Sequence, residues 1–363
     1  MDPRRSGSGR DAGGRRRVVP EEALMTQVQH GGSPGNPRRS GGGRGGDRVM
    51  VPEADFESYY GRQIVKPAPW EHDIAIYLFT GGVAAGSSLL AAGADLTGRP
   101  ALRRVARFGS LTSLLVSVGA LVHDLGKPSR FLNMLRVAKP TSPMSVGTWI
   151  LSLHGPFAGI AAAAEISAML PARWKRGPVR LLLALGRPAG IVGALTAPPV
   201  AAYTGVLLSD TATPAWHSAF KEIPFVFCGS AAAASGGLGL LGAPVAEAGP
   251  ARAFAVGGAL VELATEQQME KSMGLSAETL HQGRPGRLMR ASKALTVAGA
   301  LGALAGRRNR VVSAVSGAAL MAGSLCTRLG VYEAGIASAK DPKYTVVPQR
   351  ERVDRGEPVR YRS

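Results

Sequence analysis

The sequence predicts an all-α integral membrane protein, with about eight transmembrane helices in one bundle and a disordered basic N-terminal tail. The 363 residues carry 43 Lys and Arg against 25 Asp and Glu, a net charge of +18. The basic residues nevertheless stand in short clusters between long apolar runs. A run of about 20 apolar residues matches a hydrocarbon core of about 30 Å. The runs are too long and alternate too little for the strands of a membrane barrel, so helices are expected.

Residues 1–49 are expected to form a disordered tail rich in Gly and Arg. The tail contains runs such as GGSPGNPRRSGGGRGG and almost no large apolar residues, so it cannot bury enough surface to offset the entropy of ordering. No apolar segment follows Met1, and no cleavable secretory signal is predicted. Because the sequence from Met50 onward reads as the start of a compact protein, we expect deletion of residues 1–49 to leave membrane insertion intact.

The rest of the chain divides into three expected parts, which are an interfacial segment at 50–72, the bundle at 73–328 and a basic C-terminal tail at 329–363. Within the bundle, apolar runs alternate with basic or Pro-rich breaks, and we expect spans at 74–94, 108–123, 146–170, 188–208, 223–242, 249–266, 292–306 and 310–328. The seventh run is short, although Lys293 and Arg307 at its ends can extend to the two interfaces and let it cross.

The side of the membrane on which the loops lie is not decided by their charge. Basic residues divide almost evenly between the two sets of loops, so the positive-inside rule gives no orientation. An even number of spans places both termini on one side, and the basic tails favour the cytoplasm for that side. A multi-pass protein of the cell membrane is the expected localisation.

Pairs of small residues at four-residue spacing permit helices to approach closely. Such pairs occur at Gly82 and Gly86, at Gly155 and Gly159, and at Gly302 and Gly306. The chain has 48 glycines, so chance also produces this spacing, and no specific dimer motif is inferred.

Two classes of function are excluded by composition. Nucleic-acid binding would suit the basic charge, but the apolar runs do not fit a soluble module and aromatic residues for base stacking make up only 6%. Cys228 and Cys326 each stand alone in an apolar run, without CxxC spacing. Neither a disulfide framework nor a protein-held zinc or iron–sulfur site is therefore predicted.

In so apolar a bundle, ionisable residues at the span boundaries are the first candidates for function. The first run is preceded by the sequence WEHD, which places Trp70 before Glu71, His72 and Asp73. This sequence suits either a functional group of titratable residues or an ordinary headgroup-level anchor. The second run ends in His123 and Asp124, an imidazole beside a carboxylate that can relay protons. The alternative is that Asp124 caps the loop and His123 lies at the interface.

Tyr203 lies within the fourth apolar run. About seven residues separate it from Asp210 at the end of the run, which corresponds to roughly 10 Å of helix. A phenol at this depth can donate a hydrogen bond to a carbonyl ligand in a medium of low dielectric constant. Tyr203 is thus a candidate ligand contact rather than a tyrosine of the interfacial belt.

Two carboxylates, Glu165 and Glu262, fall within or near the ends of the third and sixth spans. A carboxylate there is either protonated or matched to a partner, and both residues are candidates for a proton path. The alternative for Glu262 is that it marks a fraying helix end together with Glu266 and Glu270.

Haem ligation is a further alternative. Membrane-embedded histidines on facing helices can ligate haem, and His123 and His154 flank one loop. No second pair of histidines is present, which argues against haem.

Three segments resemble the NrfD/polysulfide reductase membrane-subunit family. They are WEHDIAIYLFTGGVAAGSSLLAAGADLTG from Trp70, HDLGKPSRFLNMLRVAKPTSPMSVGTW from His123, and AAYTGVLLSDTATPAWHSA from Ala201. The block HDLGKPSRF is the most diagnostic of these. With the eight expected spans, the resemblance covers about residues 50–340.

The resemblance implies a membrane subunit that binds no redox cofactor of its own and is not catalytic alone. It implies a quinone or menaquinone as exchangeable substrate, with a ferredoxin-like iron–sulfur subunit and a molybdopterin catalytic subunit as partners. Tyr203 matches the family's quinone-binding tyrosine, and His72 and Asp73 are candidate contacts from the first span. His123 and Asp124 match the family's diagnostic block, and are the expected proton-handling catalytic pair on the same side.

Two other functions remain open at this point. A proton or solute transporter would use Glu165 and Glu262 along a path lined by the bundle. Transporters often show helices broken at matching places in two halves, and no convincing repeat is present here. A purely structural anchor without bound quinone is the third reading.

Overall fold

The computed structural model describes residues 63–70 and 72–356. Within these residues the chain forms helices and no strand, as the sequence predicts. The expected tail at 1–49 and most of the interfacial segment at 50–72 lie outside the described residues, so the dispensability of residues 1–49 stays a prediction.

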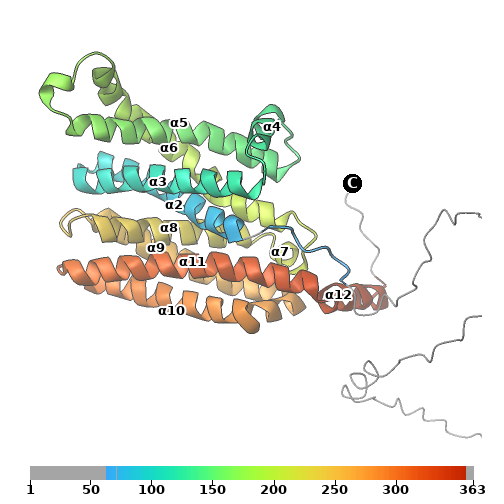
Figure 1. The fold of residues 1–363 in the computed structure, drawn as a ribbon. Coiled ribbons are helices and arrows are strands. Elements are labelled where there is room, and N and C mark those ends of the chain that lie inside the picture. Colours follow the sequence, from blue (N-terminus) through green and yellow to red (C-terminus); the bar gives the residue numbers. More distant parts are fainter. Residues whose placement is uncertain (1–62, 71, 357–363) are drawn as a thin grey trace, which may run out of the picture. The chain divides into compact units, whose positions relative to one another are not determined.

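Eight long helices account for most of the described chain (Figure 1). They are α2 (His72–Leu96), α3 (Pro100–Asp124), α5 (Pro143–Met169), α6 (Pro178–Ser209), α8 (Ile223–Gly242), α9 (Gly249–Ser272), α10 (Gly283–Ala305) and α11 (Arg310–Lys340). Shorter helical pieces connect or follow them: α4 (Arg130–Arg136), η1 (Ala172–Trp174), α7 (Pro214–Ser218), η2 (Gly274–Leu280) and α12 (Lys343–Asp354).

The long helices pack in two groups of four. Helices α2, α3, α5 and α6 form the first group, and α8, α9, α10 and α11 form the second. Helix α8 joins the groups, because it packs against α2 and α6 of the first as well as against α9 and α11 of the second (Figure 1). Successive helices of the first group are antiparallel, so the start of α2, the end of α3, the start of α5 and the end of α6 meet at one end of the bundle.

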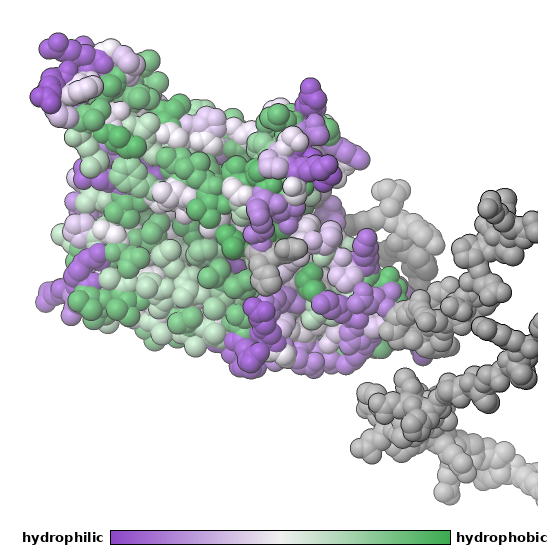
Figure 2. Space-filling view, in the orientation of Figure 1, coloured by the Kyte–Doolittle hydropathy of each residue, from purple (hydrophilic) through white to green (hydrophobic). Residues whose placement is uncertain are grey.

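Six of the long helices, α2, α3, α5, α6, α8 and α11, are long and apolar enough to cross a membrane. The sixth and seventh expected spans form α9 and α10, which are 24 and 23 residues long but carry more charged side chains. Figure 2 shows a broad hydrophobic face along the long helices, with hydrophilic residues gathered toward the helix ends. This distribution is the one that a bilayer requires.

Most helices extend beyond the apolar runs that predicted them. The fifth expected span, 223–242, coincides with α8, whereas α3 begins at Pro100 rather than at 108. Helix α11 continues to Lys340, past the expected boundary of the bundle at 328. Hydropathy marks only the apolar middle of a helix, whereas the extension of α3 contains Arg103 and Arg107 and the extension of α11 contains Glu333 and ends in Lys340.

One buried arginine connects the two groups of helices. Arg328 of α11 is fully buried and donates hydrogen bonds to the carbonyl oxygens of Leu78 (2.9 Å) and Phe227 (2.6 Å). Its guanidinium group lies 3.9 Å from the centre of the Phe227 ring, a cation–π geometry. A Cβ atom on Gly82 would lie 2.8 Å from Arg328 Nη2. The absence of a side chain at residue 82 therefore gives this arginine its space.

Two of the three small-residue pairs lie at close helix contacts. A Cβ atom on Gly86 would lie 2.4 Å from Ser235 Oγ of α8, and one on Gly302 would lie 2.3 Å from Ser316 Oγ of α11. By contrast, Gly159 has no neighbouring atom within 4 Å of a Cβ position. The first and third pairs therefore serve packing within the chain.

Candidate functional site

A cavity of about 250 Å³ lies between α2, α3, α4, α5 and α6, at the end of the bundle where α2 begins. Its wall is mostly apolar, with a small number of polar groups. The residues that line it include Trp70, Ile74, Tyr77, Leu121, Asp124, Arg130, Met134, Met144, Thr148, Tyr203 and Leu207. A concave apolar site with a few convergent polar groups is the usual form of a small-molecule site.

Two tyrosines from different helices meet in the wall of this cavity. The hydroxyl groups of Tyr77 (α2) and Tyr203 (α6) are hydrogen-bonded to each other, and their rings stand edge to face with centroids 6.3 Å apart. Both side chains are buried. Gly147 of α5 gives the Tyr203 ring its space, since a Cβ atom there would lie 2.4 Å from Tyr203 Cε2.

A histidine–carboxylate pair stands next to the cavity. His123 Nδ1, at the end of α3, lies 2.6 Å from Asp73 Oδ2 in the first turn of α2. The side chain of His123 is 81% exposed and that of Asp73 is 27% exposed, so the pair reaches water. Asp124, the neighbour of His123, lines the cavity. Three titratable groups, Asp73, His123 and Asp124, therefore lie at the end of the bundle where the cavity opens, with Asp124 in the cavity wall.

Two further polar side chains face the cavity. Arg130 of α4 supplies a guanidinium group, which also donates to the Leu125 carbonyl oxygen at 3.4 Å. Thr148 of α5 supplies a hydroxyl group, which donates to the Met144 carbonyl oxygen at 2.9 Å. The cavity therefore presents hydroxyl and guanidinium donors together with one carboxylate, an arrangement suited to a flat ligand with carbonyl groups.

Trp70 closes the cavity on the side of the second group of helices. Its ring stacks on Trp216 of α7, with centroids 5.8 Å apart, and its carbonyl oxygen accepts a hydrogen bond of 2.5 Å from the Tyr332 hydroxyl. Trp216 is buried and donates from Nε1 to the Val331 carbonyl oxygen at 2.8 Å. An aromatic stack anchored on α11 therefore holds this wall.

Four of the predicted site residues lie together. Tyr203 and Asp124 line the cavity, whereas Asp73 and His123 form the pair beside it. His123 does not line the cavity. The side chain of His72 lies outside the described part of the structure.

Sequence reasoning did not single out Tyr77, Thr148 or Arg130 as ligand contacts. A signal for Tyr77 was present, because it follows Asp73 by four residues and four residues place two side chains on the same helix face. Arg130 lies in the block HDLGKPSRF, from which only His123 and Asp124 were singled out as site residues. Thr148 carried no signal in the sequence.

Glu165 lies in an ion-pair cluster formed by α2, α3 and α5. Its side chain is 2% exposed, and Oε1 accepts hydrogen bonds from Arg103 Nε (2.5 Å) and Arg107 Nη1 (3.1 Å). Arg103 also donates to Asp95 Oδ1 at 2.8 Å. Of the two states expected for this carboxylate, the structure gives the one matched to partners. The cluster lies toward the end of α2 opposite to the cavity.

Glu262 lies in a second buried cluster, within the other group of helices. It is 1% exposed and its Oε1 accepts a hydrogen bond of 2.5 Å from Thr327 of α11. Helix α9 continues to Ser272, and Glu266 is also buried, so the alternative of a fraying helix end at Glu262 is wrong. Glu270 is paired with Lys293 at 2.6 Å. The two proton-path candidates, Glu165 and Glu262, therefore belong to separate clusters.

The ring nitrogens of His154 are both engaged by hydroxyl groups. Nε2 lies 3.3 Å from Ser88 Oγ, and Nδ1 lies 3.0 Å from Thr196 Oγ1. An axial haem ligand needs one open ring nitrogen. The structure therefore does not favour the haem alternative for His123 and His154.

In the described part of the chain, a helical bundle with six helices long and apolar enough to cross a membrane defines a multi-pass membrane protein. The family model described as polysulphide reductase, NrfD, matches residues 62–245, which is half of the chain. The chain belongs to this family, as the resemblance of its motifs indicates. No curated protein matches the chain. Family membership and the apolar helices together fit a membrane subunit of a redox complex.

Proposed function

We propose that this chain is the quinone-interacting membrane anchor of a multisubunit oxidoreductase. In this role it passes electrons between the membrane quinone pool and an iron–sulfur partner subunit, and a molybdopterin subunit carries the chemistry of the other substrate. The chain itself holds no redox cofactor, and the quinone, such as menaquinone, is an exchangeable substrate. The observation that carries the proposal is the cavity with Tyr77, Tyr203 and Asp124 in its wall.

The size and lining of the cavity suit a quinone head group. An apolar cavity of about 150 Å³ is enough to bind benzene, so the volume of about 250 Å³ has room for a substituted quinone ring. Met134, Met144 and Leu207 supply an apolar and adaptable wall for the ring. The Tyr203 hydroxyl supplies a donor for one carbonyl oxygen, and the Arg130 guanidinium group, which also lines the cavity, supplies a donor for the other.

Reduction of a quinone by two electrons also takes up two protons, so the site needs a route to water. Asp124 in the wall and the pair of His123 and Asp73 beside it provide groups that bind and release protons. We assign the exposed His123 imidazole to proton exchange with solvent and Asp124 to exchange with the ligand. The Tyr77 hydroxyl completes the donor group by orienting the hydroxyl of Tyr203.

The test is quinone-coupled turnover of the assembled complex, reconstituted with its partner subunits in lipid. A Tyr203→Phe variant removes one hydroxyl group and keeps the ring that packs against Gly147. We expect it to raise the KM for the quinone while subunit assembly is retained. Unchanged quinone kinetics for this variant would favour a structural anchor without bound quinone instead.

The second candidate function, a proton or solute transporter, is favoured by the buried carboxylates of α9. The second oxygen of Glu262 accepts no hydrogen bond among the described residues, and Glu266 is held by an ion pair with Lys293 at 3.5 Å. Buried carboxylates inside a bundle mark proton paths in many membrane proteins. Glu165 is less suited, because two arginines hold it. Liposomes that contain the chain alone separate the functions, since a transporter moves its substrate without partner subunits and a quinone-coupled anchor does not.

A further inference from the structure

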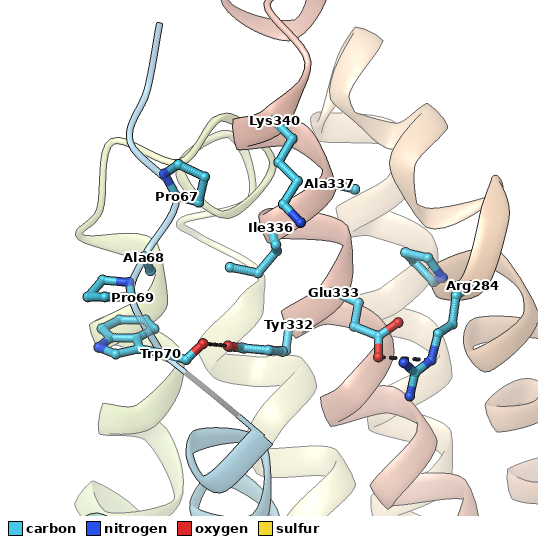
Figure 3. A pocket seen from close by; sticks show the side chains of 11 residues that line it. Pro67, Ala68, Pro69, Trp70, Arg284, Tyr332, Glu333, Ile336, Ala337 and Lys340 are labelled. Atoms are coloured by element: carbon cyan, nitrogen blue, oxygen red, sulfur yellow. Dashed lines mark hydrogen bonds and ion pairs between the residues drawn. The ribbon is translucent and has the colours of Figure 1, made fainter. Parts of the chain in front are cut away.

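A second and larger cavity, of about 720 Å³, lies at the same end of the chain but on the other side of Trp70. Figure 3 shows it between the extended segment at 67–70, the first turn of α10 and the last turns of α11. Among the residues that the structure describes, only Trp70 lines both this cavity and the smaller one. The proposed quinone chemistry makes no use of the larger cavity.

The polar wall of this cavity carries an excess of positive charge. Arg284 of α10 and Lys340 of α11 both line it, and Glu333 pairs with Arg284 at 3.2 Å. Among the described residues, no carboxylate lies within ion-pair distance of Lys340 Nζ. In Figure 3 the Lys340 side chain extends back along α11 toward Ile336 and Glu333. One ammonium group is thus left to bind an anion, and the N-terminal end of α10 adds to the positive potential.

The remaining wall is apolar and aromatic. Pro67, Trp70 and Ile336 line the cavity from the segment before α2 and from α11, and Figure 3 shows Pro67 and Ile336 on these two facing elements. A small inorganic anion would gain little from such a surface, whereas a molecule with an anionic head and an apolar chain would use both walls.

The position of the cavity relative to the membrane indicates which kind of amphipathic anion binds there. Lys340 is the last residue of α11, and Trp70 directly precedes the first turns of α2. Both helices are among those long and apolar enough to cross a membrane. The start of α2 therefore lies at the level of the lipid headgroups, where Trp is a usual anchor. Helix α11, at 31 residues, is longer than the hydrocarbon core requires and carries Lys340 to the same side, and the Lys340 side chain extends back toward that level. Basic pockets between membrane helices at this level bind anionic headgroups.

We propose that this cavity binds the phosphate headgroup of an anionic phospholipid. Lys340 and Arg284 hold the phosphate, and the upper part of an acyl chain lies against Trp70 and Ile336. The proposal concerns binding alone, and it stands whether or not the smaller cavity takes a quinone.

The experiment titrates a fluorescent phosphatidylglycerol into the purified full chain in a non-ionic detergent. Phosphatidylcholine with the same acyl chains serves as the comparison, because its headgroup carries no net charge. We expect preferential binding of phosphatidylglycerol. Lys340→Gln should weaken it about fivefold, the amount that one basic residue contributes near an anionic surface. Lys139→Gln removes an exposed lysine outside the cavity and should leave the affinity unchanged.

A third variant changes the charge in the opposite direction. Glu333→Gln releases Arg284 from its ion pair and should strengthen phosphatidylglycerol binding by a few fold. A variant that failed to fold would weaken binding instead, so a gain in affinity separates the electrostatic effect from damage to the fold.

Two outcomes would overturn the proposal. Equal binding of the two lipids, or equal binding by the wild type and Lys340→Gln, would show that the cavity does not select an anionic headgroup. Competition by soluble glycerol 3-phosphate as strong as that by the lipid would show that the site takes free phosphate compounds. Weak competition by glycerol 3-phosphate supports the lipid, because the apolar wall then contributes to binding.

Discussion

The hydroxyl groups of Tyr77 and Tyr203 are hydrogen-bonded to each other, although 126 residues separate them in the sequence. Tyr77 lies one helical turn after Asp73 on α2, and Tyr203 lies near the end of α6. The antiparallel packing of these helices brings both phenols to one wall of the smaller cavity. Each hydroxyl therefore depends on the other for its orientation.

Replacing Tyr203 by Phe should lower kcat/KM for the quinone by about tenfold, since loss of one hydrogen bond that leaves a buried partner unsatisfied costs about 1–3 kcal/mol. The partner here is the quinone carbonyl oxygen to which the Tyr203 hydroxyl would donate, and Tyr77→Phe should cause a smaller loss, because it removes only the group that orients Tyr203. Steady-state kinetics of the assembled complex with a soluble quinone analogue measures both. Tyr344→Phe on α12, a buried tyrosine outside the cavity, is the control. Equal kinetics for all three variants would contradict the role of Tyr203.

Replacing His123 by Ala should slow quinone-coupled turnover by roughly tenfold. This is less than the usual contribution of about 10²–10⁴ from a general base that touches its substrate, because His123 does not line the cavity. The stability of the fold should change by less than about 1 kcal/mol, as is typical of an exposed ion pair. Turnover measured with and without added imidazole checks the assignment. Recovery by imidazole is expected for a proton-exchange role, and its absence together with normal turnover would remove His123 from the site.

Replacing Glu165 by Gln should destabilise the protein strongly, by about 3 kcal/mol, because the buried guanidinium group of Arg107 and the partly buried one of Arg103 lose their shared carboxylate. Thermal unfolding of the detergent-solubilised protein measures the loss. Glu351→Gln is a matched control, since that carboxylate is exposed and lies 4.0 Å from Arg355, so its removal should cost almost nothing. Equal unfolding temperatures for Glu165→Gln and the wild type would mean that the cluster contributes no stability.

Replacing Gly335 by Ala should disturb both cavities. A Cβ atom at this residue would lie 1.9 Å from Trp216 Cε2, so the indole must move, and Trp70 stacks on that indole. Overpacking of this kind costs about 1–3 kcal/mol. Gly93→Ala is the comparison, because no atom lies within 4 Å of its Cβ position and alanine should stabilise α2 by about 0.5–1 kcal/mol. Opposite shifts of the unfolding temperature are expected, and a neutral Gly335→Ala would contradict the packing argument.

The helical fold was predictable because its strongest signal is local. A run such as 223–242 is apolar along its whole length, and the bilayer leaves the backbone no other way to pair its polar groups than a helix. The ends of helices were less predictable. Arg103 and Arg107 read as loop residues by hydropathy, yet they belong to α3, because Glu165 and Asp95 neutralise them from neighbouring helices.

The site was predictable in part. Tyr203, Asp124, Asp73 and His123 stood out as polar groups at the boundaries of apolar runs, and the structure gathers them at one end of the bundle. Glu165 and Glu262 stood out for the same reason but lie in two separate clusters. A polar residue within an apolar run is conspicuous in the sequence. The sequence does not show which residue of another helix it contacts.

The sequence by itself determined the class of the protein and most of the polar residues that matter, since both follow from the cost of placing charges and unpaired backbone groups in lipid. The tertiary structure decided which of these residues contact one another. Only the packing of α2 against α6 pairs Tyr77 with Tyr203, and only the return of α11 to the segment before α2 forms the larger cavity. Such contacts depend on the position of whole helices, which no short stretch of sequence specifies.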